Sequence, residues 1–164
     1  MTFILSENRK TPEHCAAAFR AYEAYLSSVK DLFPPSALRL ATSSWYFTAH
    51  RRSPHDSWLE SLSVHEASTG SRQELRHVQI RIRLLASHHD GFIELFYPKV
   101  FAYSFERTDR NSITPGTFHG DWLYDEFTLS SLNHMVHAIE WQSARWRIEA
   151  DDIHYTWNDR TQSP

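Results

Sequence analysis

LRHVQIRIRLLASHHDGFIELFY, residues 75–97, is the stretch that decides the fold. Apolar side chains occupy every second position of its first half: Val78, Ile80, Ile82, Leu84 and Ala86. A period of two is typical of a β-strand that buries one face. Gln79, Arg81 and Arg83, which are polar, lie between them and point to the other face. The first half therefore predicts a strand with one apolar and one polar face.

The second half of the stretch predicts the partner strand. Asp90-Gly91 is a favoured sequence for a two-residue type I′ turn, because both central positions of that turn need a positive φ. This turn would place Ala86 opposite Leu95 and Leu84 opposite Tyr97, so that apolar side chains face each other across the hairpin.

Similar patterns on either side of the hairpin predict further strands. The predicted strands cover residues 37–49, 57–67, 74–88, 92–105, 121–129, 134–141 and 145–157. The apolar parity changes near 42–44 and again at Asp151-Asp152, so each of these two strands needs a bulge or a break. The polar segment 107–120 predicts the longest loop.

The N-terminal part of the chain predicts one long helix, at about 12–33. Thr11 is a good N-cap residue, and Pro12 is favoured at the first helical position. Apolar side chains then recur at helical spacing: Cys15, Phe19, Tyr22, Leu26, Val29 and Phe33. Pro34-Pro35 ends the pattern. We therefore predict a single α+β domain over 1–164, with this amphipathic helix packed on a curved antiparallel meander of about six to seven strands.

Composition favours a globular, cytoplasmic protein. The 164 residues include six Trp and seven Tyr but a single cysteine, Cys15, so no intrachain disulfide can form. The sequence predicts no signal peptide and no membrane span. Residues 84–164 carry 12 acidic and 6 basic side chains, which argues against nucleic-acid binding there.

Motifs for catalysis or cofactor binding are missing from the sequence. With only four Gly, phosphate-binding loops are disfavoured, and no nucleophile elbow or zinc-protease motif is present. His88-His89 and His134-x-x-His137 are the local histidine clusters, and neither spacing places two ligands on one face of a strand. We therefore expect no cofactor, no metal and no catalytic residue. Paired carboxylates in a glycosidase-like enzyme remain a minority alternative.

The last third of the chain contains the candidate binding residues. Residues 118–159 carry eight acidic and only two basic side chains, interleaved with large aromatic rings. Aromatic anchors with a charged rim are typical of protein-binding surfaces. The candidate rim and anchor residues are Asp121, Trp122, Tyr124, Asp125, Glu126, Asp151 and Asp152.

The runs HGDWLYDEF (119–127), HAIEW (137–141) and RWRIEADDIHYTW (145–157) resemble a pattern in bacterial immunity-type proteins of polymorphic or contact-dependent toxin systems. The resemblance implies a cytosolic non-enzyme that neutralises a cognate toxin by covering its active site or a surface needed for activity. The acidic, aromatic C-terminal third would suit a basic toxin as the partner.

Two alternatives stay open. One is a carrier or enzyme with a pocket between helix and sheet, on which His137 or Glu140 would converge. The other is a homodimer formed through strand 92–105, which is apolar on both faces.

Overall fold

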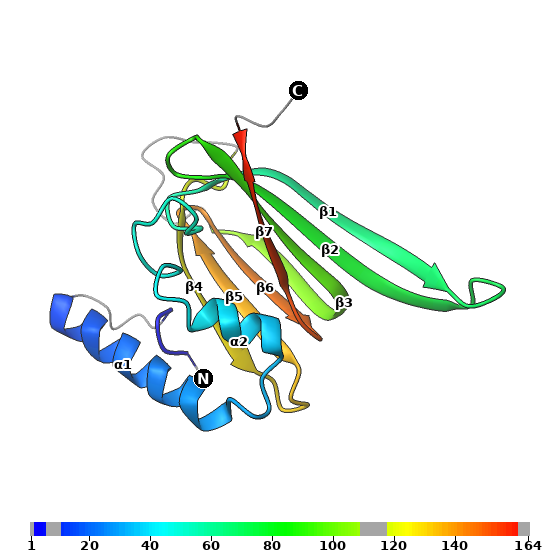
Figure 1. The fold of residues 1–164 in the computed structure, drawn as a ribbon, viewed down its shortest axis with the longest axis horizontal. Helices are drawn as coiled ribbons and strands as arrows, with labels where there is room; N and C mark the ends of the chain where they lie inside the picture. Colours follow the sequence, from blue (N-terminus) through cyan, green and yellow to red (C-terminus); the bar gives the residue numbers. More distant parts are fainter. Residues whose placement is uncertain (1, 6–10, 109–117, 161–164) are drawn as a thin grey trace.

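The predicted hairpin lies inside a seven-stranded antiparallel sheet in the computed structural model, which describes residues 2–5, 11–108 and 118–160 (Figure 1). The strands are β1 (Trp58–Thr69), β2 (Leu75–Leu85), β3 (Gly91–Arg107), β4 (Trp122–Leu129), β5 (Met135–Trp141), β6 (Ala144–Ala150) and β7 (His154–Asp159). Their order is β1-β2-β3-β6-β5-β4, and β7 also pairs with β3. The sheet does not close, and the fold class is α+β, as predicted. Most of the predicted loop 107–120 lies outside the described residues.

Strand positions follow the sequence pattern closely. The five predicted strands between 57 and 141 are confirmed, with ends that differ by at most three residues. The predicted strand 145–157 is divided into β6 and β7, and the interruption falls at the expected change of parity, Asp151-Asp152. The two pieces pair with the same edge of β3: β7 with its first half and β6 with its second half.

The register of the central hairpin differs from the predicted one. Leu84 pairs with Ile93 and Ile82 with Leu95, and the connection is longer than two residues, with a positive φ at His89. Both registers place apolar residues opposite apolar residues, because they differ by an even number of positions. Side-chain alternation therefore predicts the faces of the two strands but not the length of their turn.

Helix α1 (Pro12–Val29) begins where the sequence predicts, with Thr11 Oγ1 accepting the His14 N–H, and ends four residues before the predicted position 33. Its attachment to the sheet depends on two tyrosines. The Tyr22 hydroxyl accepts the Phe127 N–H (2.7 Å) and donates to the Phe127 carbonyl (3.1 Å), while the Tyr25 hydroxyl accepts the Leu129 N–H (2.8 Å). These side chains satisfy backbone groups on the outer edge of β4, which would otherwise be open to another strand.

The predicted strand 37–49 is wrong. Residues 35–41 form a short helix, α2 (Pro35–Ala41), and turns follow it. Pro35 occupies the first helical turn, and Ala37, Leu40 and Ala41 are buried at the i, i+3, i+4 spacing of one helix face. The alternation of Leu38 and Leu40, which fits a strand, was the misleading signal. The helix lacks a side-chain cap of its own, and the Asp152 carboxylate accepts the N–H groups of Ser36 (3.2 Å) and Ala37 (2.9 Å).

The core lies between one face of the sheet and the two helices with the turns that follow them. Its largest fully buried side chains include Trp122, Trp141, Tyr22, Tyr46, Tyr97 and Phe127. On the opposite face of the sheet, Arg81 lies over the Phe96 ring and Arg83 over the Phe92 ring, at 3.8 and 4.0 Å from the ring centres. No helix in the described residues has the length and apolar character needed to cross a membrane.

Candidate functional site

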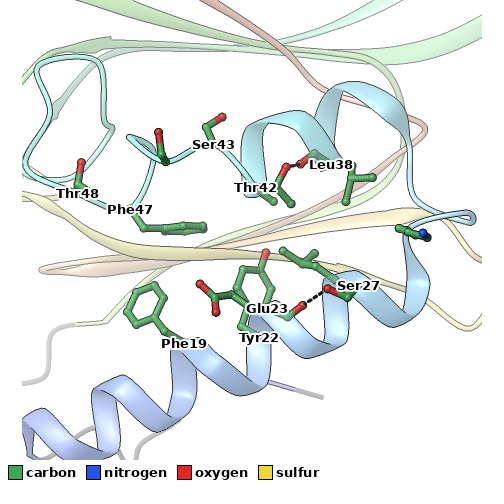
Figure 2. Close-up of a pocket in the computed structure, with 13 residues that line it drawn as sticks. Phe19, Tyr22, Glu23, Ser27, Leu38, Thr42, Ser43, Phe47 and Thr48 are labelled. Carbon is green, nitrogen blue, oxygen red and sulfur yellow. Dashed lines mark hydrogen bonds between the residues drawn. The ribbon is translucent and has the colours of Figure 1, made fainter.

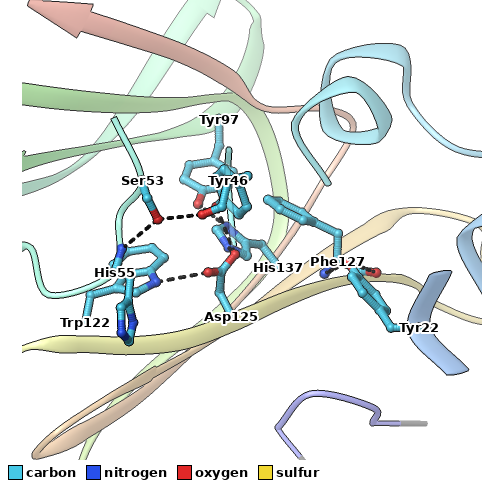
Figure 3. A network of polar contacts seen from close by, with 9 residues as sticks. All are labelled: Tyr22, Tyr46, Ser53, His55, Tyr97, Trp122, Asp125, Phe127 and His137. Atoms are coloured by element: carbon cyan, nitrogen blue, oxygen red, sulfur yellow. Dashed lines mark hydrogen bonds and ion pairs between the residues drawn. The ribbon is translucent and has the colours of Figure 1, made fainter. Parts of the chain in front are cut away.

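Asp125 is the centre of a buried polar network that joins β4 to the rest of the core (Figure 3). Its carboxylate accepts hydrogen bonds from the Tyr46 hydroxyl (2.8 Å) and the Trp122 indole N–H (3.0 Å). His137 Nε2 lies 2.9 Å from the same carboxylate. Asp125 is only 2% exposed, so these contacts replace the water that its charge would otherwise need.

His137 continues the network toward β3. Its Nδ1 lies 2.6 Å from the Tyr97 hydroxyl, and its ring stacks on Phe127 with centroids 4.0 Å apart. A neutral imidazole with its proton on Nε2 satisfies both neighbours, because it donates to Asp125 and accepts from Tyr97. Burial raises the pKa of Tyr97 well above its usual value, and the Asp125 charge adds to this effect, so the phenol keeps its proton. The buried polar groups of Asp125, His137 and Tyr97 therefore bond to one another, which gives this network a structural role.

A small pocket of about 320 Å³ lies between α1 and β4, beside this network. Phe19, Tyr46, Ser53, His55 and Asp125 are among its lining residues. The Ser53 hydroxyl donates to the Tyr46 carbonyl, and His55 Nδ1 lies 2.6 Å from the Leu123 carbonyl. These polar groups therefore bond mainly to the protein itself, which leaves them poorly suited to hold a ligand.

A larger groove of about 660 Å³ separates α1 from α2 and the turns that follow it (Figure 2). Its walls are mainly apolar, with Phe19 and Leu26 on one side and Leu38 and Phe47 on the other. Both Ser27 and Thr42 turn their hydroxyls toward backbone carbonyls of their own helices. The groove therefore offers apolar contact with few directed polar groups.

The most distinctive surface feature lies at the end of the sheet where β1 and β4 begin. Trp58 is 49% exposed there, and its indole N–H donates to Asp121 Oδ1 (2.7 Å). The His89 ring contacts the indole edge-on, with centroids 4.8 Å apart. Phe118, which is 67% exposed, helps to line the same hollow of about 450 Å³. We call this feature the Trp58 pocket, lined by Trp58, Leu59, Phe118, His119, Gly120 and Asp121.

Backbone hydrogen bonds on both sides hold the carboxylate of this pocket in place. The Asp121 carbonyl accepts the Gln142 N–H (2.9 Å), and the Trp122 N–H donates to the Ser57 carbonyl (3.0 Å). Gly120 has a φ of +79°, and a Cβ at this position would collide with Gln142. The chain therefore turns sharply before Asp121 and is fixed immediately after it.

Charge in the Trp58 pocket is acidic. Burial, followed by the nearby Arg107 charge, lowers the pKa of His119, so this histidine is neutral near pH 7 and adds no positive charge. Among the described residues, Asp121 has no cationic partner, and its only side-chain hydrogen bond comes from the neutral indole of Trp58. The pocket thus combines an accessible aromatic ring with an unneutralised carboxylate.

No family model and no curated protein matches this chain.

Three of the predicted binding residues cannot form a docking surface, because they are buried: Trp122, Asp125 and Glu126. Trp122 and Asp125 bond to each other inside the core. Glu126 Oε2 accepts the N–H groups of Phe3 (2.8 Å), Ile4 (2.7 Å) and Leu5 (3.3 Å), and so fixes the segment before α1. Predicting these three as surface residues was wrong.

The other four predicted residues are at least partly accessible, but they are not gathered in one place. Asp152 caps α2 and thus has a structural role. Its neighbour Asp151 is exposed, and Tyr124 packs near His55, with ring centroids 5.6 Å apart. Only Asp121 belongs to the Trp58 pocket.

Sequence reasoning missed the two exposed rings of the pocket. Trp58 alternates with Leu62 and Val64, which suggested a buried face, and Phe118 belongs to a segment predicted as loop. The pairing of Trp58 with Asp121 depends on how β1 and β4 meet in space, and neither sequence segment shows this. Within the described residues, no three His, Cys, Asp or Glu side chains gather closely enough to hold a metal ion.

Proposed function

We propose that this chain is a non-catalytic binding protein of the immunity type, which neutralises a basic toxin by covering part of its surface. The observation that carries the proposal is the Trp58 pocket, where a half-exposed indole lies beside a carboxylate without a cationic partner in the described chain. Tryptophan is among the residues that most often dominate the energy of protein interfaces. The acidic C-terminal half would steer a basic partner toward this anchor.

Rigidity of the pocket supports its use as an anchor. The indole is already held by its hydrogen bond to Asp121 and by contact with the His89 ring, so little side-chain freedom remains to be lost when a partner binds. The carboxylate is likewise fixed by the strands on either side of it. A preorganised anchor of this kind makes binding tighter without a larger interface.

Co-expression with the product of the neighbouring reading frame tests this proposal. We expect that product to be harmful alone, and the wild-type chain to restore growth and to co-purify with it. Trp58→Ala should abolish or strongly weaken both effects. Phe101→Ala is the matched control, because Phe101 is also a strand aromatic with a similar exposure of 43% and lies outside the pocket.

The proposal is wrong if the neighbouring product is harmless and forms no complex with the chain. It is also wrong in its choice of surface if Trp58→Ala and Phe101→Ala reduce rescue equally.

A second function, the binding of a small apolar ligand, is favoured by the groove between α1 and α2. Its volume of about 660 Å³ lies within the range of small-molecule sites. A fluorescent apolar probe such as N-phenyl-1-naphthylamine tests it directly. Saturable binding that Leu38→Glu abolishes would support a ligand site, whereas an emission spectrum unchanged by the protein would exclude it.

A further inference from the structure

Two arginines of this protein show how its surface accommodates a guanidinium group. Arg83 lies over the Phe92 ring, 4.0 Å from its centre, and donates to Glu94 at 2.9 Å. Arg51 lies over the Trp157 ring at 4.9 Å and donates to Asp159 at 2.7 Å. In both places one guanidinium group contacts an aromatic face and a carboxylate at the same time.

The Trp58 pocket supplies the same two contacts without an arginine. Trp58 provides the aromatic face and Asp121 the carboxylate, and no arginine of the described chain bonds to either. The Trp58 indole N–H donates to Asp121 Oδ1, so Asp121 Oδ2 can accept a hydrogen bond from a donor outside the described chain. Phe118 adds a second exposed ring at the edge of the hollow.

A guanidinium group fits this chemistry better than an ammonium group does. It is planar and weakly hydrated, so it can stack on an indole while its N–H groups donate to a carboxylate. An ammonium group loses more hydration on such a surface and cannot stack. The hollow of about 450 Å³ leaves ample room for one arginine side chain.

We infer that the Trp58 pocket binds an arginine side chain of the partner, with the guanidinium group over the indole and its N–H groups donating to Asp121. This inference rests on the proposed function, because it names the side chain that the same pocket recognises. Arginine is among the residues that most often dominate protein interfaces, and here it would join the aromatic anchor to the acidic charge.

Nuclear magnetic resonance titration of the full chain with small probes tests the inference. The probes are N-acetyl-arginine amide, the lysine analogue and the uncharged citrulline analogue, and the readout is the Trp58 indole N–H signal, assigned with Trp58→Phe. We expect the arginine probe to shift this signal saturably. The lysine probe should bind at least about threefold more weakly, because it lacks the stacking contact. The citrulline probe should bind far more weakly still.

Asp121→Asn should reduce the affinity for the arginine probe by about tenfold, because the charge-assisted hydrogen bond is lost. Asp151→Asn is the matched control and should leave that affinity unchanged, since Asp151 is an exposed acid outside the pocket. The far-ultraviolet circular dichroism of both variants checks that they are folded. If Asp121→Asn does not fold, the comparison of the three probes on the wild-type chain still decides the inference.

Equal binding of the arginine and lysine probes, or no shift with any probe, would overturn the inference. This failure is distinct from failure of the proposed function. If a complex with the neighbouring product forms and depends on Trp58 while the probes fail, the pocket binds a protein but not through arginine. If the probes succeed and no toxin partner exists, the arginine site stands and the immunity function does not.

Discussion

At the scale of single residues, the buried carboxylates of this protein organise its interior. Asp125 accepts from Tyr46 and Trp122, and it bonds to His137. We expect Asp125→Ala to lower the free energy of unfolding by about 3 kcal/mol or more, because three buried polar neighbours lose their common partner. Urea denaturation measures this. Asp31→Ala, at an exposed acid, should change it by less than about 0.5 kcal/mol. Equal effects of the two changes would contradict the role given to Asp125.

Glu126 has a local role that hydrogen exchange can isolate. One of its oxygens accepts three consecutive backbone N–H groups, those of residues 3–5. We expect Glu126→Ala to cost about 2 kcal/mol, since a buried carboxylate with several donors is lost. The amide of Ile4 should then exchange much faster, while amides in the centre of β3 keep their protection relative to global unfolding. An unchanged rate at Ile4 would show that other contacts hold this segment.

The sequence could not separate these residues from Asp121, although all three lie within six positions. A regular strand would place Trp122 and Asp125 on opposite faces, because they are an odd number of residues apart. The ladder between β4 and β5 shifts its register between Trp122 and Tyr124, and this irregularity turns both side chains inward. Nothing in the local sequence marks it.

At the scale of secondary-structure elements, α2 depends on a residue far away in the sequence. Pro34 provides no side-chain cap, and Asp152 bonds to the first N–H groups of the helix. We expect Asp152→Ala to lower the free energy of unfolding by about 1 kcal/mol, the usual cost of losing an N-cap. Thermal or urea unfolding measures this, with Asp31→Ala, at an exposed acid outside α2, as the control. Asp152→Asn should recover part of the loss, because an amide oxygen still accepts hydrogen bonds.

The attachment of α1 to β4 gives a second prediction at this scale. Tyr22 is buried and exchanges two hydrogen bonds with Phe127, whereas the half-buried Tyr25 hydroxyl accepts, within the described part of the chain, only from Leu129. We expect Tyr22→Phe to cost about 2 kcal/mol and Tyr25→Phe about 1 kcal/mol or less, because Tyr22→Phe strands two backbone groups in the core. Urea denaturation of both variants measures these two decreases in the free energy of unfolding, and their ratio tests the prediction. A larger loss for Tyr25→Phe would contradict this order.

Helices and strands could be predicted from the sequence where a local pattern of side chains determined them. The helix start at Thr11-Pro12 and the five strands from β1 to β5 follow from capping chemistry and side-chain alternation. The segment 37–49 was predicted wrongly, because Leu38 and Leu40 alternate as in a strand, while the cap of the short helix comes from the distant Asp152. Tertiary contacts decided that choice.

At the scale of the whole molecule, buried phenols make the fold sensitive to alkaline pH. Burial raises the pKa of Tyr22, Tyr46 and Tyr97 well above the usual value of about 10. Above pH 10 the unfolded chain loses these protons and the folded chain keeps them, so the free energy of unfolding falls as the pH rises. Each of these three groups contributes up to about 1.4 kcal/mol per pH unit, and Tyr25 and Tyr155, whose pKa values burial also raises, add to the effect. We therefore expect a slope of at least about 4 kcal/mol per pH unit well above pH 10.

Urea denaturation between pH 8 and pH 11 checks this slope. Tyr97→Phe should reduce it by up to about 1.4 kcal/mol per pH unit, because one titrating group is then missing. A free energy of unfolding that stays constant up to pH 11 would contradict the burial of the phenols.

The overall architecture was only partly predictable. The α+β class and the antiparallel sheet follow from the patterns, but the pairing of β3 with both β6 and β7 does not. That arrangement brings β1 and β4 to the same end of the sheet and so creates the Trp58 pocket. The predicted binding residues all lie within 121–152, and only Asp121 among them belongs to the Trp58 pocket.

The capping of α2 by Asp152 also constrains how this protein can evolve. Because Pro34 leaves the helix start without a cap, replacement of Asp152 is tolerated best when position 34 gains a serine, threonine, aspartate or asparagine. In relatives of this chain, the two positions should therefore covary, although they lie near opposite ends of the sequence.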